Sequence, residues 1–304
     1  MPAPTPPSDA TSAGRALDHL PLLDRECRAF AEALGQADPD APVPGCPGWT
    51  ARDLGTHVLG VQRFWTGVVR DRTPGRAERS QLVADPPPVW SELVAAVTAA
   101  SDELVDALAA TPPETPVWTF AAEKTAGFVR RRQSHEILIH RIDAEQTAGL
   151  RTPVDPALAA DGVDEMIRVL YGDLPEGWTF MPVPGLVMEL RATDTGDRWT
   201  VAMGDGLAIG PQGSFQRRPR LAALEIEGEP EPWQQPTASL TGTAEALDRW
   251  FWHRAEPASG AGREGAVAGA VEGAVDPARD AVVAEGDPDV HAALARLLAD
   301  GIRQ

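Results

Sequence analysis

The sequence predicts an α+β protein with an N-terminal four-helix bundle and a small α+β C-terminal domain. Up to about residue 150, four helical stretches of about 20 residues are joined by proline-bearing connections. Beyond that point, short apolar runs alternate with Gly, Asp and Pro turns, a pattern typical of strands. We therefore expect the bundle at residues 16–152 and the second domain at 153–304. Residues 1–15, rich in Pro, Ser and Thr, are expected to be a disordered tail.

The first two helices are defined by their apolar spacing and their ends. The first runs from Ala16 to about Gly35, where glycine supplies a C-terminal stop. The second begins after Thr50, because Thr50 followed by Asp53 is the Ser/Thr-x-x-acid pattern of a helix cap. Its buried stripe consists of Leu54, Val58, Val61, Trp65 and Val68. His57 lies on this stripe.

The third and fourth helices complete the predicted bundle. The third starts near Pro88 and ends near Ala110. The fourth includes residues 132–145, a stretch without glycine or proline. Glu136 and His140 stand four positions apart on it, so both project from one side, one turn from each other. This spacing makes them a candidate pair of metal ligands that lacks a third member.

The second domain is predicted as helices and short strands in sequence. A helix is expected from Asp155 to Gly172, and another from Thr243 to His253. Strands are expected at 186–190, 199–203, 221–226, 239–242 and 282–285. Residues 255–280 contain near-repeats of small residues and are predicted to be a flexible insertion. A last helix is expected at 287–302.

Composition limits the class of protein. Hydrophobic residues make up 43% and charged residues 24%, as in soluble globular proteins. The formal net charge of -18 argues against nucleic acid or an anionic membrane as partner, because both would be repelled. Two cysteines, Cys27 and Cys46, are too few for a disulfide-stapled fold. With no signal-peptide pattern and no apolar run long enough to span a membrane, we expect a cytoplasmic protein.

His57 is the candidate third ligand. It lies on a different helix from Glu136 and His140, and bundle cores build metal sites from facing helices. Spacing alone also allows a role without metal for the Glu136–His140 helix and for His57. Arg132 and Glu136 could form an ion pair on a solvated face, and His57 could be a hydrogen-bonded histidine in a packed helix seam.

Two separated motifs resemble a known family. The run Val43-Pro-Gly-Cys-Pro-Gly-Trp-Thr-Ala-Arg-Asp-Leu-Gly-Thr-His57 and the pattern Glu136-x-x-x-His140-Arg-x-Asp143 are similar to the mycothiol-dependent maleylpyruvate isomerase family. That family sits within the DinB-like four-helix metalloproteins. The resemblance extends to residues 159–165 and 242–254, which resemble the start and a late helix of the family's C-terminal domain. It leaves out the N-terminal tail and the 255–280 insertion.

The resemblance implies a divalent metal, most often zinc, held by His57, Glu136 and His140. Two histidines and one carboxylate with an open position describe a catalytic zinc. The open position would take the thiol of mycothiol as a thiolate, which attacks a small electrophilic substrate. In an isomerase the adduct rotates about the former double bond and expels the thiol. In an S-transferase the thiol stays attached or displaces a leaving group.

Further residues are candidates around this centre. Asp143 could accept the far N–H of a ligand histidine and orient its ring, the alternative being a surface charge. Arg254 resembles the arginine that ends the family's late helix and could clamp a substrate carboxylate, the alternative being compensation of the helix C-terminus. Arg249 is a weaker candidate for the same role. Trp49 and Arg254 are assigned to cofactor binding, and Asp143 and Arg254 to catalysis.

Cys46 and His135 are set aside. Cys46 precedes a proline in a loop and has no neighbouring histidine in sequence to activate it, so we expect it to pack against Trp49. His135 points about 100° away from Glu136 on a helical wheel. Tryptophans such as Trp65, Trp250 and Trp252 are expected in the core.

Two other functions compete with a mycothiol-dependent enzyme. The same three ligands could serve a metal-dependent hydrolase, with bound water in place of the thiol. Alternatively, the chain could be a non-catalytic zinc-binding regulatory protein, with its fourth coordination position filled by protein.

Overall fold

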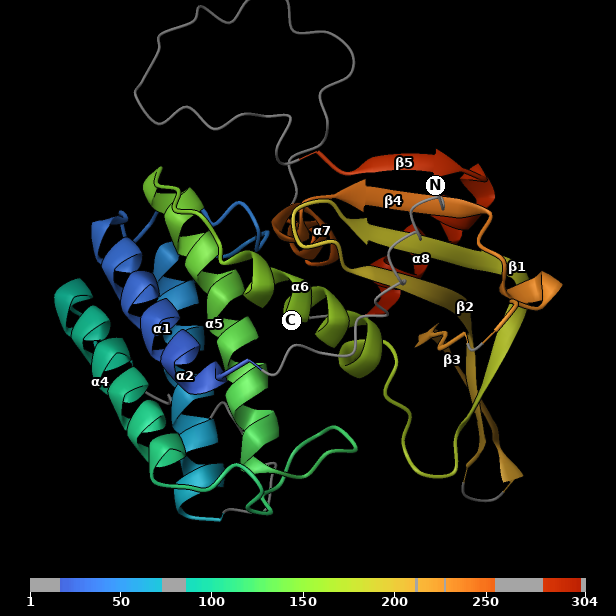
Figure 1. Ribbon diagram of the computed structural model, residues 1–304. Helices are drawn as coiled ribbons and strands as arrows, with labels where there is room; N and C mark the ends of the chain where they lie inside the picture. Colours follow the sequence, from blue (N-terminus) through green and yellow to red (C-terminus); the bar gives the residue numbers. More distant parts are fainter. Residues whose placement is uncertain (1–16, 73–85, 211–212, 227, 255–280, 302–304) are drawn as a thin grey trace, which may run out of the picture. The chain divides into compact units, whose positions relative to one another are not determined.

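A computed structural model describes residues 17–72, 86–210, 213–226, 228–254 and 281–301 (Figure 1). The predicted tail at 1–15 and the predicted insertion at 255–280 lie outside the described residues. The described chain divides into two compact units. One consists of Leu17–Val154 with Trp252–Arg254, and the other contains Asp155–Phe251 and residues 281–301.

The first unit is a four-helix bundle, as predicted. Its helices are α1 (His19–Gln36), α2 (Ala51–Arg70), α4 (Trp90–Ala109) and α5 (Ala126–Ala148). Helix α1 packs against α4 and α5, and α2 packs against the same two helices. The core between them consists mainly of leucines, valines, alanines and aromatic residues, among them Leu23, Phe30, Leu34, Leu54, Leu59, Leu93, Leu104 and Trp65.

Local capping sets the ends of the two helices that matter most for function. At the start of α2, the Thr50 hydroxyl accepts from the Asp53 backbone N–H, and the Asp53 carboxylate accepts from the Thr50 N–H at 2.8 Å. This confirms the predicted capping box. Helix α5 is longer than predicted at both ends. Thr125 caps its start, and Gly149 ends it in the left-handed conformation, with φ 70°.

Helix α5 is buried on nearly all sides, including its charged residues. Arg132 is 3% exposed, His140 1% and Asp143 0%. The alternative of a solvated polar face is therefore wrong for these three residues, although the Arg132–Glu136 ion pair of that alternative is present and the Glu136 side chain is 23% exposed. Period alone could not decide this point, because the polar residues form one stripe whether that stripe faces water or a buried network.

The second unit combines helices with a five-stranded sheet of order β3-β2-β1-β4-β5, which confirms the predicted α+β class. Its strands are β1 (Thr179–Ala192), β2 (Arg198–Ile209), β3 (Phe215–Ala223), β4 (Ala238–Gly242) and β5 (Val283–Gly286). Strand β1 pairs parallel with β4, whereas the other neighbouring pairs are antiparallel.

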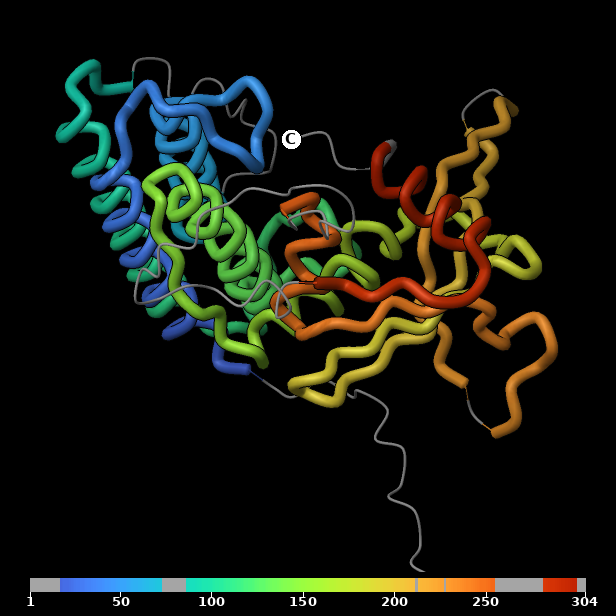
Figure 2. Tube along the Cα trace, turned by 90° about the horizontal axis from the view of Figure 1, so that it is seen from above, coloured from blue at the N-terminus to red at the C-terminus, as the bar shows by residue number. Residues whose placement is uncertain are grey.

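The helices of this unit are α6 (Pro156–Glu165), α7 (Ala244–Phe251) and α8 (Pro288–Gly301). Helix α6 continues into a π-helical turn, Met166–Leu170, and packs against α7. Helix α8 packs across β1, β3 and β4, as the view in Figure 2 shows.

Three strand predictions need correction. β1 and β2 extend well beyond the predicted 186–190 and 199–203, because their outer parts pair with each other without forming an apolar run. β3 ends at Ala223 and begins at Phe215, earlier than the predicted 221–226. Its first half is rich in arginine, so its strand character comes from pairing with β2 rather than from hydrophobic pattern. No helix in the described part of the chain is long and apolar enough to cross a membrane.

Candidate metal centre

The bundle brings His57 of α2 to the Glu136–His140 pair of α5. The Nε2 atoms of His57 and His140 each lie 3.5 Å from the same oxygen, Glu136 Oε1. The two imidazole rings have centroids 4.9 Å apart. One ligand atom from each of the three residues lies within 4.8 Å of the others, so the group could hold a metal ion.

His57 Nε2 is the least satisfied atom of this group. It is buried and makes no hydrogen bond to any described residue. A buried polar nitrogen without a partner is unfavourable by about 1–3 kcal/mol. An imidazole nitrogen that faces two other ligand atoms fits a divalent cation, because a bound ion would satisfy all three groups together.

Glu136 offers only one of its two carboxylate oxygens to this space. Its Oε2 accepts a charge-assisted bond of 2.6 Å from Arg132 Nη2, which leaves Oε1 facing the histidines. Burial would raise the pKa of Glu136, but the Arg132 guanidinium and the two histidines outweigh it and hold that pKa well below its ordinary value. The carboxylate is therefore ionised at neutral pH.

His140 is held from behind by Asp143. Its Nδ1 lies 3.0 Å from Asp143 Oδ2, one turn along α5. Burial would lower the pKa of His140, but the bonds to Asp143 and Glu136 raise it. The alternative of a surface charge for Asp143 is wrong, because this carboxylate is fully buried. Burial also opposes its ionisation, yet the bonds from His140 and Arg254 lower the pKa of Asp143.

Arg254, which follows α7 in the chain, joins this network. Its Nε donates to Asp143 Oδ1 and its Nη2 to Asp143 Oδ2, both at 3.0 Å. The carboxylate that Arg254 clamps in this structure is thus that of Asp143, and a substrate carboxylate would have to compete with it. Arg249, the weaker candidate, pairs with Glu245 at 2.9 Å in the other compact unit.

Cys46 contacts this network rather than serving only as loop packing. Its Sγ lies 3.4 Å from Asp143 Oδ2 and accepts from Arg254 Nη2 at 3.2 Å. Burial and the neighbouring Asp143 carboxylate raise the pKa of the Cys46 thiol to about 12. It is a protonated thiol at neutral pH and a poor nucleophile, in line with the sequence-based exclusion. Trp49, at the end of the same loop, places its ring 5.0 Å from that of His57.

Sequence reasoning missed two features of this site. The first is Gly45, where a Cβ would overlap Asp143 Oδ1 and crowd Arg254, so only glycine lets the loop approach this pair. The second is Trp252, which was expected only as core. The ring of Trp252 lies against the Arg132 guanidinium. Neither contact could be predicted locally, because Gly45 lies in a Pro/Gly-rich loop and Trp252 in an aromatic stretch after α7.

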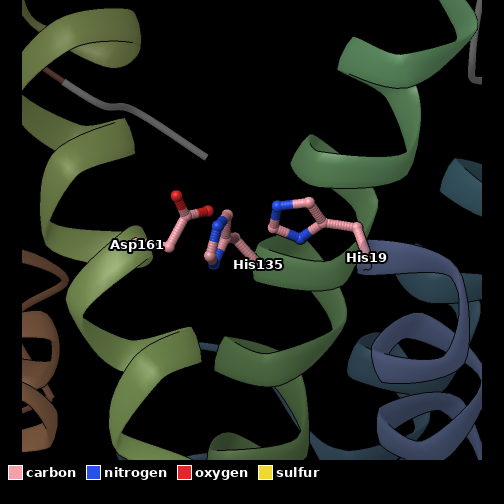
Figure 3. A group of neighbouring side chains, drawn as sticks. All are labelled: His19, His135 and Asp161. Atoms are coloured by element: carbon pink, nitrogen blue, oxygen red, sulfur yellow. The ribbon is translucent and has the colours of Figure 1, made fainter. Parts of the chain in front are cut away.

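His135 lies in a separate pair with His19. The two rings have centroids 5.7 Å apart in an edge-to-face arrangement (Figure 3), and His19 Nδ1 lies 2.9 Å from Ser134 Oγ. His135 thus lies beside the start of α1 and is not a member of the His57–Glu136–His140 group.

The N-terminal half of the chain matches a family model. Residues 20–145 match the mycothiol maleylpyruvate isomerase N-terminal domain. The matched range includes His57, Glu136, His140 and Asp143, whereas Arg254 lies outside it.

Two solved structures share the fold over most of the chain. They are a mycothiol-dependent maleylpyruvate isomerase and a histidine-to-alanine mutant of that enzyme, with TM-scores of 0.51 and 0.52. Each is 14% identical in sequence, and each alignment covers 77% of this chain and 87% of the other. At this identity the comparison shows a common fold that continues beyond the N-terminal domain. No curated protein matches the sequence.

Proposed function

We propose that this protein is a divalent-metal-dependent enzyme that uses mycothiol to isomerise a small electrophilic substrate, in the manner of maleylpyruvate isomerase. The N-terminal domain match and the shared fold support the reaction class. The observation that carries the metal assignment is the buried His57 Nε2, which has no hydrogen-bond partner among the described residues and faces Glu136 Oε1.

The residues present fit a catalytic zinc ion. Two imidazoles and one carboxylate are the donor set of catalytic sites that keep a position open for a ligand. His140 also has the arrangement common to zinc-bound histidines, with a carboxylate on its far ring nitrogen. His57, Glu136 and His140 would hold the ion. When bound, such an ion supplies Lewis acidity that lowers the pKa of a thiol at its open position.

The surrounding residues fix the protonation and orientation of these donors. Nδ1 of His140 is bound to Asp143, so Nε2, the ring atom that faces Glu136, is the one that would hold an ion. Arg132 keeps Glu136 ionised and occupies its second oxygen. Arg254 in turn keeps Asp143 ionised and in place. These contacts hold the three donor side chains in position.

Trp49 is the side chain best placed to contact the thiol cosubstrate. It is half-buried, beside His57, and lies on the loop directly before α2. An aromatic face there would shield the reacting sulfur from water. Arg254 could add a substrate contact only by releasing an oxygen of Asp143.

The test combines metal content with thiol binding and turnover. Purified protein is measured by elemental analysis, titrated with mycothiol by calorimetry, and assayed for cis-trans isomerisation of maleylpyruvate with and without mycothiol. We expect His57→Ala and Glu136→Ala to lose metal and thiol binding together. His291→Ala, which changes a histidine of the other compact unit, serves as the control and should retain both.

Specific outcomes would overturn the proposal. Undiminished metal in both His57→Ala and Glu136→Ala would remove the ligand assignment. Turnover of a hydrolysable substrate without any thiol would indicate a metal-dependent hydrolase. Tightly bound metal without thiol affinity would indicate a zinc-binding regulatory protein. A stable thioether product in place of an isomer would indicate S-transfer.

A further inference from the structure

A three-residue segment, Trp252–Arg254, belongs to the bundle unit although it directly follows α7 in the chain. Trp252 is 5% exposed and Arg254 8% exposed, whereas His253 between them is exposed. His253 has a φ of 58°, in the left-handed region that non-glycine residues rarely occupy. Such strained residues persist where the surrounding contacts hold them in place, and they cluster at functional sites.

Trp252 contacts the guanidinium that orients Glu136. Arg132 Cζ lies 5.5 Å from the centroid of the Trp252 ring, within the range of a cation–π interaction. The same guanidinium donates to Glu136 Oε2 at 2.6 Å. Since Arg132 is only 3% exposed, the indole replaces water as the environment of one side of this cation.

Arg254 connects the same segment to the second ligand of α5. It binds Asp143 through two N–H groups, and Asp143 holds Nδ1 of His140. The segment is also tied internally, because Arg254 Nη1 donates to the Trp252 carbonyl at 2.6 Å and Arg254 Cζ lies 6.0 Å from the Trp252 ring. The indole therefore lies against two buried guanidinium groups, each bound to a carboxylate.

We propose that Trp252 is a positioning residue of the metal centre, which holds Arg132 on Oε2 of Glu136 so that Oε1 alone is available to the ion. In the same segment, Arg254 holds Asp143, which binds His140. Residues 252–254 therefore position both metal ligands on α5. The inference rests on the proposed function for the presence of the ion. It adds that the geometry of the ligands is set by a segment more than 100 residues away in sequence.

The test measures cobalt(II) affinity and the visible absorption of the cobalt-loaded protein, which reports ligand geometry independently of turnover. We expect Trp252→Leu to weaken affinity roughly 10- to 100-fold, the range found when partners of metal ligands are removed. The cobalt spectrum should also change, because Glu136 can then bind through both oxygens. Trp252→Phe, which keeps an aromatic face, should recover most of the affinity.

Trp65→Leu is the matched control. Trp65 is 3% exposed in the same bundle, and its ring packs on Phe64 and Trp118. This variant should lower the melting temperature as much as Trp252→Leu while leaving the cobalt affinity and spectrum unchanged. Equal losses of affinity in the two variants would mean that Trp252 acts only as core, and would overturn the inference.

A backbone variant avoids any change in the core. His253→Gly introduces a residue that readily adopts the positive φ of this position, whereas His253→Val introduces a β-branched residue that resists a positive φ. We expect wild-type cobalt affinity and spectrum for His253→Gly and a loss for His253→Val. No difference between them would contradict a positioning role for the segment. Absence of cobalt binding in the wild-type protein would instead reject the proposed function, so the two failures are distinguishable.

Discussion

Two buried polar clusters share helix α5 and differ in completeness. The first, His57–Glu136–His140, is open, because His57 Nε2 has no hydrogen-bond partner among the described residues. The second, Cys46–Asp143–Arg254, is closed, because both oxygens of Asp143 and the Cys46 sulfur accept from Arg254. Both clusters contain side chains that could bind a metal ion, and His140 belongs to both candidate groups.

The difference teaches how to assign roles to buried polar groups. In the closed cluster a cation of the protein, Arg254, already neutralises the carboxylate, so a metal ion there would have to displace a buried ion pair. In the open cluster the Nε2 atoms of His57 and His140 both face Glu136 Oε1, and no cation of the protein lies between them among the described residues. His140 connects the two by using Nδ1 in the closed cluster and Nε2 in the open one. The closed cluster therefore stabilises and orients, and the open one is available for a ligand.

The largest effect is expected from breaking the closed cluster. Asp143→Ala leaves the Arg254 guanidinium buried without its carboxylate, which destabilises a protein by about 3–5 kcal/mol. Urea unfolding of the metal-free protein measures this change. The double variant Asp143→Ala/Arg254→Met should recover part of the loss, because it removes the unpaired charge. A loss below about 1 kcal/mol for Asp143→Ala would mean that the cluster is not the stabilising one.

A smaller effect is expected from crowding the closed cluster. In Gly45→Ala the new methyl group meets Asp143 and Arg254, and overpacking of this kind destabilises by about 1–3 kcal/mol. Gly35→Ala is the control, since its Cβ would lie 3.7 Å from Val94 Cγ1, an ordinary contact in a helix. That change should be neutral or stabilising. Thermal unfolding of both variants checks the prediction, which fails if the two melting temperatures move together.

A substitution in the open cluster should raise the stability of the metal-free protein, whereas the two substitutions above lower it. His57→Leu removes the unpartnered nitrogen, so the metal-free protein should become about 1 kcal/mol more stable. The same variant should lose the stabilisation that added zinc gives to the wild-type protein, since His57 is a proposed ligand. Unfolding curves with zinc and with chelator measure both parts. Destabilisation without metal would show that His57 has a structural partner after all.

The smallest effect lies outside both clusters, at the start of α2. Thr50→Ala removes a helix cap and should reduce stability by about 1 kcal/mol at neutral pH. Bonds from Thr50 lower the pKa of Asp53 below its ordinary 3.8, so this interaction stabilises above that pH and is lost as the pH falls through the folded value. Denaturation at pH 7 and in acid should therefore show the difference between wild type and Thr50→Ala narrowing in acid.

Sequence and tertiary structure contributed different parts of this description. Capping signals at Thr50 and the i,i+4 spacing of Glu136 and His140 are local, so they could be predicted from neighbouring residues. His57 was found by combining its place on the stripe of α2 with the family resemblance. The outer halves of β1 and β2 and the first half of β3 could not be found in this way. Their pairing depends on the partner strand and not on apolar pattern.

The sequence by itself determined the four helices, the α+β class and three candidate ligands, because these depend on period, caps and short motifs. Only the tertiary structure decided that Asp143 is buried, that Cys46 and Arg254 meet at it, and that Trp252 reaches Arg132. Such contacts join residues separated by about 100 or more positions in the chain. They arise from how helices and loops pack, which spacing along the chain does not encode.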